Sequence, residues 1–145
     1  MPQPTLYFEN TLATISEHPD GYVLFAYRAG KRELPDLRAA LAHTGNLLHR
    51  RQWHRILGDQ RLMAASTPEE RELIAAYWQQ QTHVLGYGIC VASILAEDVF
   101  ARLAATQLRA ELKVANVGYR VFDDEAGASA WLCAQTTCPP LEQSQ

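Results

Sequence analysis

The segment from Arg55 to Glu70 constrains the fold of this chain more than any other. It begins with a short apolar run at 56–58, continues through a polar turn and then reaches Thr67-Pro-Glu-Glu. Thr67 suits the N-cap of a helix, Pro68 its first position, and Glu70 the return contact of a capping box. The segment therefore predicts a buried strand that leads into a helix, the repeating unit of an α/β fold.

The remainder of the chain repeats this alternation of strand and helix. Strands are expected at about residues 5–16, 22–28, 53–59, 87–95 and 117–122. Helices are expected at about 34–50, 67–81 and 97–112, with a short final helix capped by Asp123. The order β-β-α-β-α-β-α-β-α predicts a single-domain α/β fold with four helices and a mainly parallel, mixed sheet of about five strands. The first two strands are expected to form an antiparallel hairpin at its edge.

Length and charge narrow the classes of protein. The 145 residues are expected to form one domain over 1–135, followed by a loose tail at 136–145. A net charge of −3 argues against binding to nucleic acid, which needs many contacts from Lys and Arg to phosphate. The sequence shows neither a secretory signal nor an apolar run of ~20 residues, so we expect a cytoplasmic protein that does not span a membrane.

The three cysteines do not form a regular pattern. Cys90 lies in an apolar run and is expected to be buried as a small hydrophobic side chain. Cys133 and Cys138 flank a short polar segment, where a bridge between them is sterically conceivable and free thiols are the preferred interpretation.

Three sequence patterns resemble a known family. They are Trp-x-x-x-Leu-Gly-Asp-x-Arg at 53–61, Ala-Glu-Asp-Val-Phe-Ala at 96–101, and Tyr-Arg-Val-Phe-Asp-Asp-Glu-Ala-x-Ala-x-Ala-Trp-Leu at 119–132. Together with the order of elements over residues 6–134, they resemble the small bacterial SpoIIAA-like proteins of the STAS superfamily. That resemblance implies a fold like that of anti-sigma-factor antagonists, which is also related to CRAL-TRIO lipid-transfer domains.

The resemblance also implies a place for a regulatory site. In the antagonist branch, a serine in an Asp-Ser-Ser-Gly motif is phosphorylated at the start of the helix after the central strand. The matching region here, 59–70, lacks that motif and has Ser66 and Thr67 as its nearby hydroxyls. These two residues are the candidate phosphate acceptors of an alternative function, a regulator switched by phosphorylation.

Residues for catalysis are not evident in the sequence. Asp59 and Arg61 follow a strand, where they either orient a ligand or form an ion pair that closes the turn. The chain has no Gly-x-Ser-x-Gly motif and no Gly-rich phosphate loop, and its five histidines lack the spacing of a zinc site. We therefore expect no enzyme activity, no catalytic residue, no cofactor and no metal ion.

A non-enzymatic binding or interaction module is the leading prediction. Aromatic side chains gather in the second half of the chain, among them Trp78, Tyr87 and Phe100. If the second and third helices splay, these residues frame a pocket for a hydrophobic small molecule. Alternatively, another subunit in a homodimer or a partner protein covers the same apolar surface. Asp59 and Arg61 complete this predicted ligand or partner surface.

Overall fold

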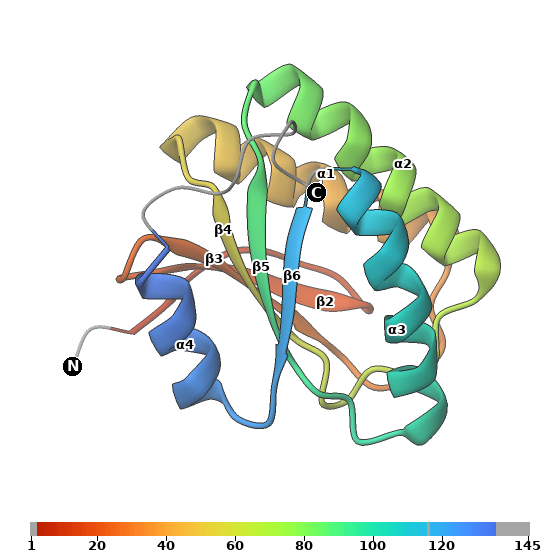
Figure 1. Ribbon diagram of the computed structural model, residues 1–145. Coiled ribbons are helices and arrows are strands. Elements are labelled where there is room, and N and C mark those ends of the chain that lie inside the picture. Colours follow the sequence, from red (N-terminus) through yellow and green to blue (C-terminus); the bar gives the residue numbers. More distant parts are fainter. Residues whose placement is uncertain (1–2, 116, 136–145) are drawn as a thin grey trace.

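A computed structural model describes residues 3–115 and 117–135 of the chain (Figure 1). The strands are β1 (Thr5–Glu9), β2 (Ala13–His18), β3 (Tyr22–Tyr27), β4 (Arg55–Asp59), β5 (Ile89–Ile94) and β6 (Val117–Phe122). The helices are α1 (Leu34–Arg51), α2 (Pro68–Leu85), α3 (Val99–Val114) and α4 (Glu125–Cys133). The predicted α/β class and four helices are confirmed. The expected tail at 136–145 lies outside the described residues.

The strands form one mixed sheet in sequence order, β1-β2-β3-β4-β5-β6. β1, β2 and β3 pair antiparallel, whereas β3 to β6 pair parallel. The described sheet thus has six strands rather than about five, because the single strand expected at 5–16 is two strands joined by a turn. The Asn10 side chain makes this turn: its Oδ1 accepts hydrogen bonds from the backbone N–H groups of Leu12 and Ala13.

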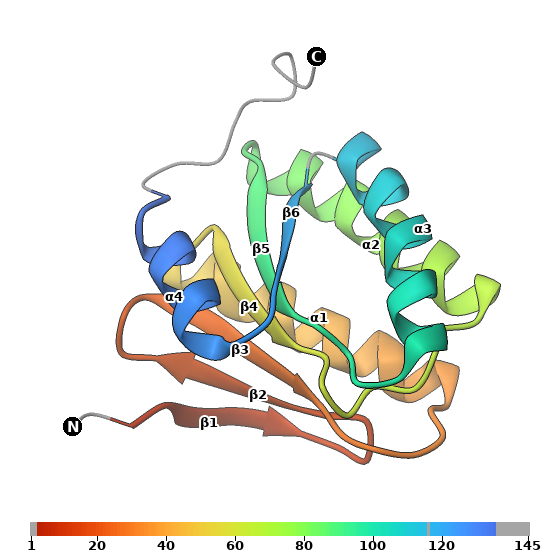
Figure 2. The ribbon, with the colours of Figure 1, turned by 60° about the horizontal axis from the view of Figure 1, so that its bottom comes forward.

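The sheet is covered on both faces, but unequally. Figure 2 shows α1, α2 and α3 on one face and α4 on the other. Each of the first three helices links a strand to its parallel neighbour, and right-handed crossovers that advance in one direction place them on one side. The larger core lies under these three helices and includes Ile15, Leu48 and Trp78. The smaller core lies under α4 and includes Leu57 and Leu132.

Helix starts follow the sequence closely, with one correction. Thr67 Oγ1 accepts from the N–H of Glu70, and Glu70 Oε1 accepts from the N–H of Thr67, so the predicted capping box is confirmed. For the final helix the prediction of Asp123 is wrong, since Asp124 is the N-cap and its Oδ1 accepts from the N–H of Gly127 at 2.8 Å. The extra residue extends the loop that leaves β6 before α4 begins.

The cysteines and the lengths of the helices were also predicted from the sequence. Cys90 is buried, as predicted, and Cys133 is an exposed free thiol, whereas Cys138 lies outside the described residues. Over residues 3–115 and 117–135, none of the helices combines the length and apolar character that crossing a bilayer requires.

Candidate functional site

A small cavity lies between the sheet and the three helices on its larger face. Its volume is about 60 Å³. A water molecule needs roughly 10–15 Å³ by this kind of measure, so the space holds a few waters or a group of a few heavy atoms. The apolar part of its wall is formed by Phe25, Leu41, Ile56, Ile74, Trp78, Val91, Leu108, Leu112 and Val117.

Three polar side chains from neighbouring strands meet in this apolar cavity. Gln60 directly follows β4, Ser93 lies in β5 and Tyr119 in β6. Gln60 Nε2 donates to Tyr119 Oη at 3.2 Å. The Ser93 hydroxyl is buried and makes no hydrogen bond of acceptable geometry with the described residues. We call these three residues the polar cluster of the cavity.

Gly58 leaves room beside the polar cluster. A Cβ atom at this position would lie 3.3 Å from Ser93 Oγ, closer than most carbon contacts. Because residue 58 has no side chain, the Ser93 hydroxyl faces the cavity rather than a packed neighbour. A buried hydroxyl without a partner is costly, so a guest molecule that hydrogen-bonds to it would recover that free energy.

The phenols of the cavity stay protonated at neutral pH. Burial raises the pKa of Tyr119, although the nearby Ser93 and Gln60 side chains and the charge of Arg109 act in the opposite direction. Burial also raises the pKa of Tyr27, which lines the same cavity, despite the lowering effect of Arg32. Both hydroxyls are therefore neutral donors and acceptors rather than bases.

Of the predicted surface residues, only Trp78 lies at this cavity. It is 6% exposed and packs edge-to-face on Tyr77, with ring centroids 5.0 Å apart. A larger pocket would require the second and third helices to splay, but Thr82 Oγ1 of α2 donates to the carbonyl of Ala115, at the end of α3, at 2.8 Å and joins the two helices there. The space between these helices is therefore far smaller than a lipid-sized pocket.

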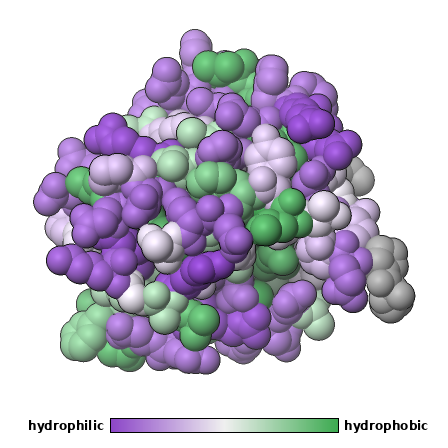
Figure 3. Space-filling view, turned by 180° about the vertical axis from the view of Figure 1, so that it is seen from behind, coloured by the Kyte–Doolittle hydropathy of each residue, from purple (hydrophilic) through white to green (hydrophobic). Residues whose placement is uncertain are grey.

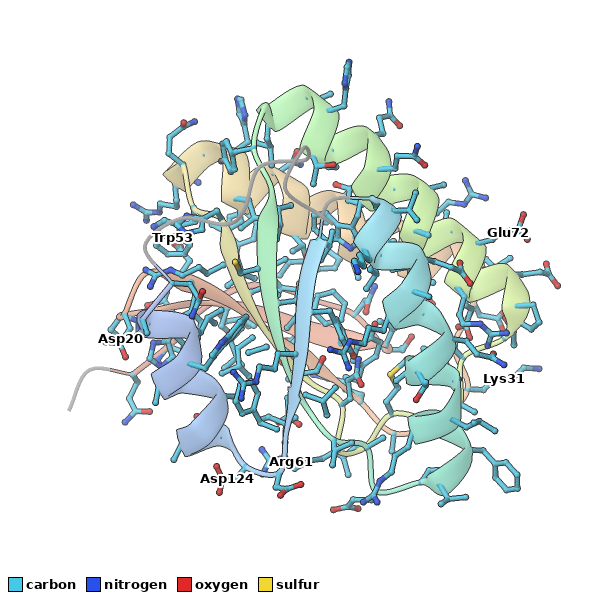
Figure 4. The ribbon with its side chains drawn as sticks, in the orientation of Figure 1. Asp20, Lys31, Trp53, Arg61, Glu72 and Asp124 are labelled. Carbon is cyan, nitrogen blue, oxygen red and sulfur yellow. The ribbon has the colours of Figure 1, made fainter. Side chains whose placement is uncertain are left out.

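Asp59 and Arg61 form an ion pair at the end of β4. Arg61 donates from Nη2 to Asp59 Oδ2 at 2.7 Å and from Nε to Oδ1 at 3.0 Å. Burial alone would raise the pKa of Asp59, but the hydrogen bonds and charge of Arg61 hold it below its ordinary value. Figure 4 shows Arg61 close to Asp124, where α4 begins, and Glu125 Oε1 lies 3.9 Å from the guanidinium. The pair closes the turn after β4, and the Arg61 guanidinium and the Asp59 carboxylate neutralise each other.

Ser66 and Thr67, the candidate phosphate acceptors, stand just before α2. Ser66 is buried, at 8% exposure, and its carbonyl accepts from Arg71 Nη1 at 2.8 Å. The Thr67 hydroxyl caps the helix, as described above. Both residues are thus engaged in the start of α2.

Beneath that helix start lies a buried ion pair that the sequence did not indicate. Arg32 donates from Nε and Nη2 to the two carboxylate oxygens of Glu70, at 2.8 and 3.0 Å. The two side chains are only 4% and 7% exposed. Burial acts to raise the pKa of Glu70, yet the hydrogen bonds and charge of Arg32, with hydrogen bonds from Thr67, lower it overall. This pair ties the loop before α1 to the start of α2.

The remaining predicted residues, Phe100 and Tyr87, are far from the cavity and from each other along the fold. Phe100 lies in the first turn of α3 and is 70% exposed. Three other large hydrophobic side chains are also more than half exposed: Val99 and Leu103 in the same helix, and Leu62 in the loop after β4. Figure 3 shows hydrophobic residues gathered at the lower left, the corner that holds the start of α3. Tyr87 follows α2 at the amino ends of β4 and β5, where its hydroxyl donates to the carbonyl of Trp53 at 3.2 Å.

Sequence reasoning missed the polar cluster. The residue that could have indicated it is Ser93, the one hydroxyl within the apolar run Ile-Cys-Val-Ala-Ser-Ile at 89–94. A hydroxyl in a strand buried on both faces requires a partner or faces a cavity. Gln60 and Tyr119 gave no comparable signal, because each sits in a segment that also suits a surface turn or an ordinary strand.

The described residues contain no cluster of three or more His, Cys, Asp or Glu side chains placed to hold a metal ion. Comparison with known proteins gives no match to any family model, any curated protein sequence or any solved structure at a significant level.

Proposed function

We propose that this chain is a non-enzymatic binding module that takes up a small molecule in the cavity under α1, α2 and α3. The observation that carries the proposal is the buried Ser93 hydroxyl, which lacks a well-formed hydrogen bond and faces a cavity with apolar walls. Ligand sites of this kind combine an apolar lining with a few convergent polar groups.

The lining defines the chemical class of the ligand. A hydroxyl, an amide and a phenol form the polar cluster, so the ligand needs one uncharged group that donates and accepts hydrogen bonds. A charged group would lose its hydration without gaining an opposite charge in the cavity. With a volume of about 60 Å³, the cavity fits a short-chain alcohol or a group of that size rather than a whole lipid.

The likeness to SpoIIAA-like proteins supports a binding role of this kind without specifying the ligand. The site chemistry agrees with a role without turnover. Asp59 and Arg61 satisfy each other's charge, and the phenols of the cavity have raised pKa values that disfavour proton abstraction. A general base needs a pKa near the working pH.

Titration with straight-chain alcohols, followed by amide NMR of ¹⁵N-labelled protein, tests the proposal. We expect ethanol, propan-1-ol and butan-1-ol to shift the amide signals of Gln60, Ser93 and Tyr119 in a saturable manner. Ser93→Ala should weaken this binding about tenfold, the equivalent of one hydrogen bond of roughly 1.4 kcal/mol.

Thr106→Ala is the matched control, because it removes an exposed hydroxyl of α3 that donates to the carbonyl of Arg102 at 3.2 Å. It should leave alcohol binding unchanged. Native mass spectrometry of freshly purified protein adds a second measurement, in which a co-purified small neutral molecule would identify the natural ligand. Alcohol shifts confined to the surface, or equal in the wild type and Ser93→Ala, would disprove a site at the polar cluster.

A further inference from the structure

The outer face of α3 carries a second apolar stripe besides the one that packs on the core. The buried stripe is Ala101, Ala104, Leu108 and Leu112. The outer stripe consists of the apolar residues Phe100, Leu103, Ala110 and Val114 with the polar Gln107 at its middle; all are exposed, and the spacings are three, four, three and four residues. This alternation keeps side chains on one line along a helix and is the pattern by which two helices pair. Phe100, Leu103 and Val114 are 70%, 62% and 75% exposed.

The stripe is graded in size along the helix. Phe100 and Leu103 lie near its start, whereas Ala110 and Val114 lie near its end. Antiparallel pairing with a second copy places large side chains against small ones, whereas parallel pairing would stack two Phe100 rings and leave a gap between the alanines. Gln107 lies near the middle, and its amide both donates and accepts, so two copies can hydrogen-bond across a two-fold axis.

The charges near the two ends of α3 are opposite in sign. The exposed charges at the start of the helix are Glu97, Asp98 and Arg102, which sum to a net negative charge. Those at its end are Arg109, Glu111 and Lys113, which sum to a net positive charge. In an antiparallel pair each acidic start meets the basic end of the other copy, whereas parallel pairing brings like ends together. Opposite potentials favour association and fix its orientation. Size and charge therefore select the same occupant and the same direction.

We propose that the outer stripe of α3 pairs with the same stripe of a second copy of this chain, antiparallel about a two-fold axis. The interface is independent of the cavity and its ligand. A helix of 16 residues is about 24 Å long, so contact through it alone falls at the small end of interface sizes. We therefore expect a reversible dimer with a micromolar dissociation constant.

Sedimentation velocity over a range of about 1 to 100 μM measures this equilibrium. The wild type should pass from monomer to dimer as the concentration rises. Phe100→Ser and Ala110→Arg should each raise the dissociation constant at least about tenfold, because one removes the largest contact and the other places a charge in the stripe. Val84→Ser, at a 63% exposed position of α2, is the control and should leave it unchanged.

A charge swap tests the direction of pairing. Lys113→Glu should weaken the dimer, because the acidic start of one protomer would then face another carboxylate in its partner. Adding Glu97→Lys should restore it. In a parallel pair each end of α3 would face the same end of the other copy, so like charges would face each other before and after each substitution, and neither substitution would turn repulsion into attraction. Circular dichroism of each variant checks that the fold is retained.

Three results would overturn the proposal. One is a protein that stays monomeric up to 100 μM. Another is a dimer that Phe100→Ser and Ala110→Arg leave intact, which would place the interface elsewhere. The third is a Lys113→Glu defect that Glu97→Lys deepens instead of correcting. None of these results bears on alcohol binding at Ser93, so the two proposals fail separately.

Discussion

At the scale of the residue, two buried polar groups have opposite effects on stability. Glu70 is fully used: its carboxylate receives two hydrogen bonds from Arg32 and one from the backbone of Thr67. Ser93 keeps a buried hydroxyl that lacks a well-formed hydrogen bond. Removing the first leaves a buried cation without its counter-charge, whereas removing the second relieves a cost.

Replacing Glu70 by glutamine should destabilise the protein by roughly 3 kcal/mol at pH 7, since the Arg32 guanidinium would remain buried without an opposite charge. Urea unfolding measures the change. Glu72→Gln, at an exposed position of the same helix labelled in Figure 4, is the control and should stay within about 0.5 kcal/mol of the wild type. A similar loss in both variants would show that the buried pair contributes little.

The same pair should give the protein a defined acid sensitivity. The folded-state pKa of Glu70 lies below its ordinary value of 4.5, so its stabilising effect is complete above pH 4.5 and is lost as the pH falls through the folded pKa. The difference in unfolding free energy between wild type and Glu70→Gln should therefore shrink below pH 4.5. Unfolding curves at intervals from pH 7 to about pH 3 follow it. A constant difference over this range would contradict the assignment.

For Ser93→Ala we expect the opposite sign, a gain of about 1 kcal/mol in unfolding free energy, because a buried hydroxyl is removed and little space is created. Thermal unfolding without alcohol measures it. This gain should accompany the loss of alcohol binding, a combination typical of a site whose polar group serves a ligand. A destabilised Ser93→Ala variant would mean that the hydroxyl already has a stabilising partner in the protein.

At the scale of the element, the contact between α1 and α2 depends on one glycine. A Cβ at Gly45 would fall on the Tyr77 hydroxyl of α2 and within 3.3 Å of Gln81 Oε1. Glycine costs a helix about 1 kcal/mol relative to alanine, so a glycine inside a helix is favoured only where close packing requires it. The structure shows that it does: the two helices approach closely at this point because residue 45 has no side chain.

Gly45→Ala should therefore destabilise the protein despite the higher helix propensity of alanine, by about 1–3 kcal/mol, the usual cost of overpacking. In a Tyr77→Phe background the hydroxyl that meets the new methyl is gone, and the same substitution should cost clearly less. A double-mutant cycle from thermal unfolding yields this coupling. If Gly45→Ala costs the same in both backgrounds, the helices do not meet as described.

At the scale of the whole molecule, two cores on opposite faces share one sheet. Leu48 of α1 packs in the larger core, and Leu132 of α4 packs in the smaller one; both are 0% exposed. A further link between α4 and the sheet is the hydrogen bond between Tyr22 Oη and Ser129 Oγ, at 2.9 Å. The strands β3, β4 and β5 contribute side chains to both cores. The loss of packing in one core should therefore also lower the stability of the other.

Leu48→Ala and Leu132→Ala should each lower the unfolding free energy by about 2–5 kcal/mol, as expected for fully buried leucines. Both variants should still unfold in a single transition. Far-UV circular dichroism and tryptophan fluorescence, recorded on the same samples, should give coincident curves. Separate transitions in Leu132→Ala would instead show that α4 is a weakly coupled addition to the sheet.

Local interactions explain why the sequence alone was sufficient for much of the fold. The capping box at Thr67, the apolar stripe of each helix and the doubly buried strand at 89–94 depend on residues within about one turn or one strand. Their pattern is thus visible in sequence. The errors were also local: the turn at Asn10 was missed within an apparently continuous strand, and the last cap was placed one residue early. Such boundaries depend on side-chain hydrogen bonds more than on hydrophobic periodicity.

Only the tertiary structure decided which polar groups meet. Gln60, Ser93 and Tyr119 are separated by a helix each, and they converge because β4, β5 and β6 lie side by side as parallel strands of one sheet. The pairing of Arg32 with Glu70 spans 38 positions for the same kind of reason. The sequence thus determined the strand–helix units and their caps, which short-range forces specify. The cavity, its unpaired hydroxyl and the free outer stripe of α3 arise only when those units pack, because burial is a property of the assembled layers.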